Sequence, residues 1–217
     1  MGELLYLVGT STLQTLLMVL FSTVFSMILG FPLGVLLSIT KANGIMPRKV
    51  LNQVLSRIVN VLRSFPFIIL MIVLFPLSRL IVGTSIGTAA TIVPLSIAAA
   101  PFVARVIESA LNEVNPELVQ AAKSMGSTNM QIILKVLIPE ALPSLVDGVT
   151  LTIINLIGYS AMAGAIGGGG LGDLAIRYGY QRFRTGIMAA AVIVILVLVE
   201  LIQFFGSKIS ARLLAKR

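Results

Sequence analysis

Residues 115–126, which read NPELVQAAKSMG, form a polar stretch between two strongly apolar parts of the chain. Both ends carry helix signals: Asn115 is a favoured N-cap residue, Pro116 suits the first helical position, and Gly126 suits the left-handed residue after a helix. The spacing predicts a short helix over 116–125, about ten residues and roughly 15 Å long. A polar helix with a defined start and stop inside so apolar a chain is expected to be a docking element.

A second helix start follows directly. Thr128 and Gln131 have the spacing of a capping box, in which each side chain bonds the backbone N–H of the other residue. Residues 112–139 are therefore expected to be a structured loop that connects two apolar segments.

The composition indicates a membrane protein. Of the 217 residues, 57% are hydrophobic and only 11% are charged, and the mean hydropathy is +1.04. Soluble domains of this size do not carry apolar runs that approach the ~20 residues needed to cross a hydrocarbon layer of ~30 Å. The sequence predicts an all-α polytopic membrane protein with one membrane domain over residues 1–217.

Several chemistries are excluded by what the sequence lacks. It has no cysteine and no histidine, so disulfides and thiol chemistry are absent, and neither a metal site nor another bound cofactor is expected. It has no G-x-x-x-x-G-K-[ST] motif, so any ATP hydrolysis is expected in another subunit. The net charge of +8 does not indicate nucleic-acid binding, because the basic residues flank apolar segments as in membrane proteins. Glu3 and the missing basic start predict no cleavable signal.

Apolar runs predict five membrane-spanning helices, with ends uncertain by several residues. The expected spans cover about 12–39, 64–82, 88–110, 143–166 and 186–205. An odd number of spans places the two termini on opposite sides of the membrane.

The distribution of basic residues predicts the orientation. With the N-terminus outside, twelve of the 16 basic residues fall on or near the cytoplasmic side, as the positive-inside rule expects. The twelve are Lys41, Arg48, Lys49, Arg57, Arg63, Arg105, Lys123, Lys135, Lys208, Arg212, Lys216 and Arg217. The same orientation places the polar loop and the C-terminus in the cytoplasm.

Shorter patterns predict how the helices meet. Residues 51–63 form an amphipathic helix, expected at the cytoplasmic interface before the second span. Gly30 and Gly34 have the spacing of a close helix contact, either within the chain or with a second copy. Arg105 and Glu108 lie three apart near the inner end of the third span and are expected to pair.

Two motifs on the outer side leave alternatives open. The run 167–172, GGGGLG, is either a flexible loop or a tight turn that lets chain segments pack closely. The run 159–164, YSAMAG, surrounds one flexible thioether with small residues. Its Met162 either packs in the core or forms an apolar constriction, alone or with a symmetry mate.

With these features established, the chain resembles the permease subunits of bacterial ABC importers. Their cytoplasmic loop has the pattern Glu-Ala-Ala, three residues, Gly, about nine residues, then Ile-x-Leu-Pro. This chain has 120–122 as Gln-Ala-Ala, then Gly126, then 137–139 as Leu-Ile-Pro. Gln120 departs from the usual glutamate, which moves the expected contact from charge toward packing. The likeness is closest to methionine-uptake permeases, on motifs such as 63–68, RSFPFI, and 158–162, GYSAM.

The resemblance implies the partners and the location. It implies two copies of this chain, two copies of an ATPase that binds ATP and Mg, and an extracytoplasmic methionine-binding protein, all at the inner membrane of a bacterium. This chain would be a transport subunit and not an enzyme. It also implies the site residues. Those that couple to the ATPase would be Glu117, Leu118, Gln120, Ala121, Ala122, Lys123, Met125 and Gly126. Those that form the pathway or gate would be Tyr159, Ser160 and Met162.

Three other functions would leave different signals in the sequence. A permease for another small amino acid or osmolyte in the same family would share these motifs. A self-contained secondary carrier would show acidic groups at the membrane midplane or inverted repeats, and the sequence shows neither. An assembly protein without transport would not need a capped cytoplasmic helix.

Overall fold

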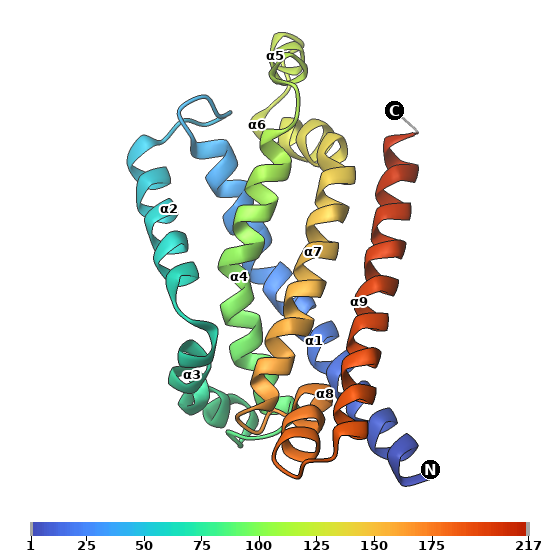
Figure 1. The fold of residues 1–217 in the computed structure, drawn as a ribbon. Coiled ribbons are helices and arrows are strands. Elements are labelled where there is room, and N and C mark those ends of the chain that lie inside the picture. Colours follow the sequence, from blue (N-terminus) through green and yellow to red (C-terminus); the bar gives the residue numbers. More distant parts are fainter. Residues whose placement is uncertain (1, 216–217) are drawn as a thin grey trace.

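The computed structural model describes residues 2–215, and every regular element within them is helical. Lys216 and Arg217, counted above as cytoplasmic, lie outside the described residues. The elements are α1 (Gly2–Thr40), α2 (Lys49–Ser64), α3 (Phe67–Val82), α4 (Thr88–Asn112), α5 (Pro116–Ser124), α6 (Asn129–Ile132), the π-helix η1 (Ile133–Leu137), α7 (Ile138–Gly164), α8 (Gly170–Asp173), the π-helix η2 (Leu174–Tyr180) and α9 (Thr185–Leu214). They form a bundle with α5 and the C-terminus at one end and the N-terminus, α8 and the end of α3 at the other (Figure 1).

The long first helix packs against α4 through the two glycines of the G-x-x-x-G motif. A Cβ atom on Gly34 would lie 2.6 Å from the Ala104 carbonyl oxygen, and one on Gly30 would lie 2.5 Å from the Ala100 carbonyl oxygen. These distances leave no room for a side chain, so the glycines allow the backbones to approach closely. The motif is therefore a packing contact within the chain.

The buried side chains gather in clusters around α4 and α7. The cluster nearest α5 joins α1, α4, η1 and α7, and its buried members include Ile39, Ile107, Leu111, Ile132, Leu137 and Leu145. The next cluster lies further along the same helices and includes Met18, Leu95, Ala99, Leu156 and Ile157. Side chains on α9 pack against this second cluster, but the spanning stretch of that helix is only 11% buried. The α4–α7 pair is thus the core on which the other helices lie.

The structure identifies fewer clear spans than the five that the sequence predicts. Judged by length and composition, three helices in the described residues can cross a membrane, namely Leu4–Thr40, Thr88–Asn112 and Thr185–Leu214. The pair α2 and α3 adds a fourth only if the two helices count as one span, although they are bent by 102°. With 27 residues, α7 is also long enough by length alone.

The observed helices differ from the predicted spans mainly in where they begin and end. The first helix begins at Gly2 and the last continues to Leu214, because helical structure extends beyond the apolar run in both cases. The predicted span at 143–166 is a helix from Ile138 to Gly164, with Pro139 in its first turn and Pro143 inside it. The predicted span at 64–82 is shorter than expected, since α3 has 16 residues, or about 24 Å.

The amphipathic helix is present as α2, but it lies lengthwise beside α4 (Figure 1). Val59 is buried, and with Leu55 it packs against Leu37 and Ala104. Several apolar side chains on the rest of α2 are exposed, among them Val50, Val54, Ile58 and Val61. The chain then turns sharply into α3.

The glycine run after α7 forms an ordered tight turn and not a flexible loop. Gly167, Gly169 and Gly170 have φ angles of 89°, 78° and 78°, which residues with a Cβ rarely adopt. The N–H groups of Gly170 and Leu171 donate to side chains of α1, each at 2.9 Å. The turn leads into α8 and η2, two helices that the hydrophobic pattern did not predict.

Candidate functional site

The α5 helix is closed at both ends by the residues that the sequence indicated. The Asn115 side chain accepts a hydrogen bond from the Glu117 N–H at 2.9 Å, and Pro116 occupies the first helical position. At the other end Gly126 has φ 78°, and the Ser127 N–H donates to the Ala122 carbonyl at 3.1 Å. These contacts form an N-cap and a Schellman ending, so both predictions are confirmed.

The capping box after α5 is also confirmed. The Thr128 N–H donates to the Gln131 side chain at 2.9 Å, and the Gln131 N–H donates to the Thr128 hydroxyl at 3.3 Å. From Asn129 the chain is helical without a break through α6, η1 and α7. Only a short turn therefore separates α5 from the helical run that becomes α7.

The faces of α5 are divided between solvent and the bundle. No α5 residue is fully buried, and Leu118 and Met125 are 42% and 85% exposed. Val119 and Ala122, however, pack against the cluster nearest α5. The apolar face available to another protein is thus formed by Leu118, Ala121 and Met125 without Ala122, which the sequence analysis had placed with them.

Gln120 and Lys123 lie on a further side of α5, where they line a cavity of about 180 Å³. The ends of α1 and α4 supply the opposite wall, including Lys41 and Asn112. Glu117 remains exposed at the start of the helix. The predicted coupling residues therefore share one short helix and its C-terminal end, and all of them except the half-buried Ala122 are exposed.

The predicted gate residues separate onto two sides of α7. Ser160 is buried, and its hydroxyl donates to the Ile157 carbonyl at 2.8 Å, so it faces the core. Met162 is 50% exposed, and the ring of Tyr159 stacks on Phe67 with centroids 4.4 Å apart. Tyr159 also lines a cavity of about 270 Å³ that is described below.

An exposed stripe runs along α7 through Met162. It contains Asp147, Leu151, Gly158, Met162 and Ala165, all exposed and spaced three to seven residues apart. Leu151 and Met162 are 49% and 50% exposed. Asp147 accepts a hydrogen bond from Ser210 of α9 at 2.8 Å. Leu151 and Met162, about half exposed among the described residues, leave the rest of the stripe available to line a pathway or to meet a second copy.

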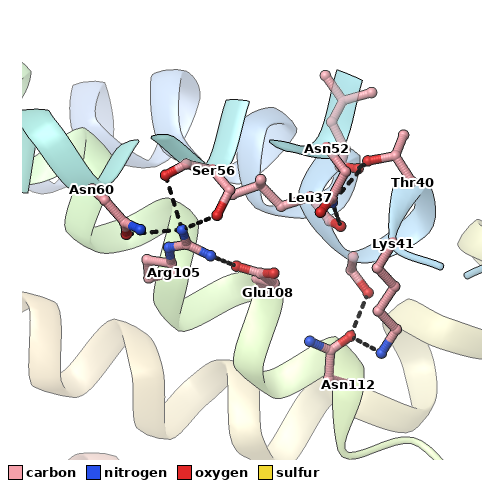
Figure 2. Close-up of polar contacts among 11 residues, drawn as sticks. Leu37, Thr40, Lys41, Asn52, Ser56, Asn60, Arg105, Glu108 and Asn112 are labelled. Carbon is pink, nitrogen blue, oxygen red and sulfur yellow. Dashed lines mark hydrogen bonds and ion pairs between the residues drawn. The ribbon is translucent and has the colours of Figure 1, made fainter. Parts of the chain in front are cut away.

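The sequence does not predict the polar contact that joins α2 and α4 (Figure 2). Arg105 of α4 pairs with Glu108 at 2.6 Å, as predicted, and it also donates to the Ser56 hydroxyl at 2.5 Å and to Asn60 at 2.8 Å. We call Ser56, Asn60, Arg105 and Glu108 the α2–α4 polar contact. The amphipathic pattern of residues 51–63 predicts instead a helix whose polar side faces the cytoplasmic membrane interface. Their four-residue spacing is the signal that could have indicated a polar partner helix.

A second polar group joins the ends of α1 and α4. Lys41 donates to the Asn112 side-chain oxygen at 2.5 Å, and the Ser38 hydroxyl donates to the same atom at 3.0 Å (Figure 2). Asn52 of α2 donates to the Leu37 carbonyl at 2.8 Å. With the α2–α4 polar contact, these bonds hold α1, α2 and α4 together beside α5. In the residues that the structure describes, no cluster of acidic side chains is suited to a metal ion.

Comparison with known proteins identifies the family. Residues 30–215 match the family described as "Binding-protein-dependent transport system inner membrane component". The chain is 54% identical over 203 residues to the probable D-methionine transport system permease protein MetI of Vibrio cholerae, covering 94% of this chain and 90% of that protein. It is 48% identical to the D-methionine transport system permease protein MetI of Escherichia coli K12 over 161 residues, or 74% of each chain.

Solved structures agree with the sequence relatives. A chain from the inward-facing MetNI methionine ABC transporter superposes with a TM-score of 0.96 at 45% identity, covering 98% of this chain and 99% of that one. A chain from an amino acid ABC transporter shares the fold, with a TM-score of 0.74 at 19% identity. The chain belongs to the family of binding-protein-dependent transport system inner membrane components, the membrane-embedded permeases of ABC importers.

Proposed function

We propose that this chain forms the path by which methionine crosses the inner membrane of a bacterium in an ATP-driven importer. The observation that carries the proposal is α5, a helix closed at both ends, exposed on one face and connected through a short turn to the helical run that becomes α7. The relatives named above, one of them 54% identical, are described as D-methionine transport system permeases, and this description supports methionine as the substrate.

The proposed arrangement in the membrane has five crossings, with the N-terminus outside and the C-terminus in the cytoplasm. The positions of the ends support it, since α5 and the C-terminus lie at one end of the bundle and the N-terminus at the other (Figure 1). Most basic residues fall toward the α5 end, as the positive-inside rule expects. The α2–α3 bend would then lie within the second crossing, and α7 would make the fourth.

The proposed partner at the cytoplasmic end is a separate ATPase, which would bind ATP and Mg. Leu118, Ala121 and Met125 offer it a narrow apolar face, because the small alanine lets the helix lie close to another surface. A helix with satisfied ends can move as a rigid body. Closure of two ATPase subunits would draw two such helices together and shift the start of α7 in each copy.

A second copy of this chain is proposed to complete the pathway. The exposed stripe of α7 would face its counterpart, and Met162 with Tyr159 would form the narrow part between them. Met side chains adapt to irregular apolar contacts, which suits a closure that opens and reseals. A methionine-binding protein would deliver the substrate at the opposite end from α5.

Uptake by a reconstituted complex tests the proposal. The chain would be copurified with its ATPase, placed in liposomes with the binding protein, and assayed for ATP-dependent uptake of radiolabelled methionine. We expect uptake with the active ATPase and none with a hydrolysis-deficient ATPase. Uptake that needs no ATPase, or uptake of another solute in place of methionine, would contradict the proposal.

The docking role of α5 is tested by one matched pair of variants. Ala121→Phe places a bulky ring on the exposed face of α5, whereas Ala211→Phe places the same ring at an exposed position of α9. We expect the first variant to lose ATPase binding or uptake and the second to retain both. Equal behaviour of the two variants would remove the docking role.

A further inference from the structure

A cavity of about 270 Å³ opens where α2 ends and α3 begins, facing α4 and α7. Its lining combines one charged side chain, two polar ones and an apolar remainder. The residues that matter here are Arg63, Phe67, Phe102, Asn155 and Tyr159. The volume lies just below the range of about 300–1,000 Å³ typical of sites for drug-sized ligands, so the cavity suits a small solute.

This mid-bundle cavity lies far from both ends of the molecule. Ala98 and Phe102 of α4 line it, and Ala98 is about 15 Å from the start of α4 and about 21 Å from its end at 1.5 Å per residue. Arg63 stands in the last turn of α2, about 21 Å along the helix axis from Lys49. Arg63, expected on or near the cytoplasmic side, thus lies near the middle of the length of the bundle.

Arg63 differs from the neighbouring arginine of the α2–α4 polar contact. Arg105 has Glu108, Ser56 and Asn60 as partners. Among the described residues, Arg63 makes no hydrogen bond or ion pair. A guanidinium has five N–H donors and cannot shed its charge. The Arg63 side chain is exposed on the single chain, so these donors are open to a ligand at the edge of the cavity.

The rest of the lining suits an apolar side chain next to a polar head. Phe67 and Tyr159 stack with an interplanar angle of 6°, and Phe102 adds a third ring. Thioether sulfur packs favourably against aromatic rings. The Asn155 amide oxygen and the Tyr159 hydroxyl are acceptors for an ammonium group. Tyr159 also lies three residues from Met162 of the exposed stripe, so the cavity adjoins the proposed pathway.

We infer that the mid-bundle cavity binds the transported amino acid, with its carboxylate on Arg63 and its apolar side chain against Phe67, Phe102 and Tyr159. The ligand class is a zwitterionic amino acid with an unbranched apolar side chain. This inference rests on the proposed function and extends it: the permease itself selects for a carboxylate, in addition to any selection by the binding protein.

Equilibrium binding tests the inference without the binding protein. The chain with its ATPase would be placed in lipid nanodiscs, and binding of radiolabelled L-methionine would be measured for the unaltered chain, Arg63→Gln and Arg57→Gln. Arg57 lies on the same helix and is exposed, as Arg63 is, but it does not line the cavity. The ATPase is common to all three samples, so methionine held by the ATPase contributes equally to each.

We expect Arg63→Gln to weaken binding about 10-fold to 100-fold, because a charge-assisted hydrogen bond to the carboxylate is lost. Arg57→Gln should bind within twofold of the unaltered chain. Arg63→Lys keeps the charge without the planar fork and should recover part of the loss. Equal affinities for Arg63→Gln and Arg57→Gln would overturn the inference.

Competition on the unaltered chain gives a test that no folding defect can affect. Norleucine has a carboxylate and an unbranched apolar side chain and should displace methionine, whereas methioninol, which lacks the carboxylate, should not. Equal displacement by both would overturn the role of Arg63. The same sample, given the binding protein, separates the two proposals. ATP-dependent uptake without methionine binding in the nanodisc would refute the cavity alone, and absence of uptake would refute the proposed function.

Discussion

The α5 loop and the α2–α4 polar contact are neighbouring regions held together in opposite ways. The ends of α5 are closed by bonds between residues two to five apart, such as Asn115 with the Glu117 N–H and Ser127 with Ala122. In the α2–α4 polar contact, Arg105 reaches Ser56 and Asn60, which are 49 and 45 residues away. The first region is exposed and locally complete, whereas the second is partly buried and exists only when the bundle has formed.

The comparison indicates that α5 and the α2–α4 polar contact serve different purposes. A region that must move against another protein benefits from a structure that survives displacement, and local caps provide one. A region that must keep three helices in place needs bonds between them. Changes to the polar contact should therefore alter global unfolding, and changes to α5 should alter local opening and coupling.

The largest effect on stability is expected from Arg105→Met. The variant keeps the volume of the aliphatic stem, but it leaves the Glu108 carboxylate without its ion pair and removes the bonds to α2. The paired side chains are 21% and 16% exposed, so we expect a loss of about 2–3 kcal/mol in unfolding free energy. Thermal unfolding in detergent would measure it.

Arg57→Met is the matched control for this change. It removes the same charge from an exposed position of α2 and should alter stability by no more than about 0.5 kcal/mol. A melting temperature of Arg105→Met equal to that of the control would show that the polar contact does not hold α2.

A smaller and local effect is expected from Gly126→Ala. A Cβ at this position would meet no atom within 4 Å, so the cost comes only from the φ angle of 78°. We expect about 1–2 kcal/mol of local destabilisation, seen as faster hydrogen exchange of the α5 amides with little change in the melting temperature.

Gly186→Ala supplies the comparison for the glycine. Gly186 also has open space around its Cβ position, but it lies inside α9 with ordinary helical backbone. This substitution should be neutral or slightly stabilising. Similar exchange in both variants would mean that the Gly126 conformation does not close α5.

Asn115→Ala should have a slightly smaller local effect than Gly126→Ala. It removes the acceptor for the Glu117 N–H and should cost about 1 kcal/mol of local stability, which hydrogen exchange of the first α5 turn would detect. Asn115→Asp keeps an oxygen acceptor at the N-cap and should restore the protection. If Asp fails to restore it, the cap is not what holds the start of α5.

The smallest effect on folding is expected from Met125→Ser, which should change unfolding by no more than about 0.5 kcal/mol because the side chain is 85% exposed. It should nevertheless weaken ATPase binding severalfold, since apolar area is lost from the docking face. Copurification and thermal unfolding of one sample would compare the two readouts. Met188→Ser, at an exposed position of α9, should leave ATPase binding unchanged.

The sequence predicted the α5 region closely because its signals act over a few residues. Asn115, Pro116, Gly126 and the Thr128–Gln131 box all have the predicted roles. The same reasoning was less reliable where helices meet. It assigned Ala122 to the docking face, because a helical pattern does not show which neighbour covers a face. It also grouped Ser160 with Met162, although residues two apart lie on nearly opposite sides of a helix.

The outer turn shows the same limit. The sequence left the run 167–172 as either a flexible loop or a tight turn, and the structure shows the turn. What decides it is a pair of bonds from Gly170 and Leu171 to side chains of α1, 156 residues away. No local pattern carries that information.

By itself the sequence determined that this is an apolar helical chain with a capped polar helix near its middle. It also determined that most basic residues fall on one side of the expected membrane. Composition, capping and charge act within single helices or at their ends, so they can be read along the chain. Only the tertiary structure decided that the polar face of α2 meets α4, that Arg63 has no hydrogen-bond or ion-pair partner among the described residues, and that Arg63 and Tyr159 line the same cavity. These arrangements depend on contacts between distant segments, whose free energy no single segment contains.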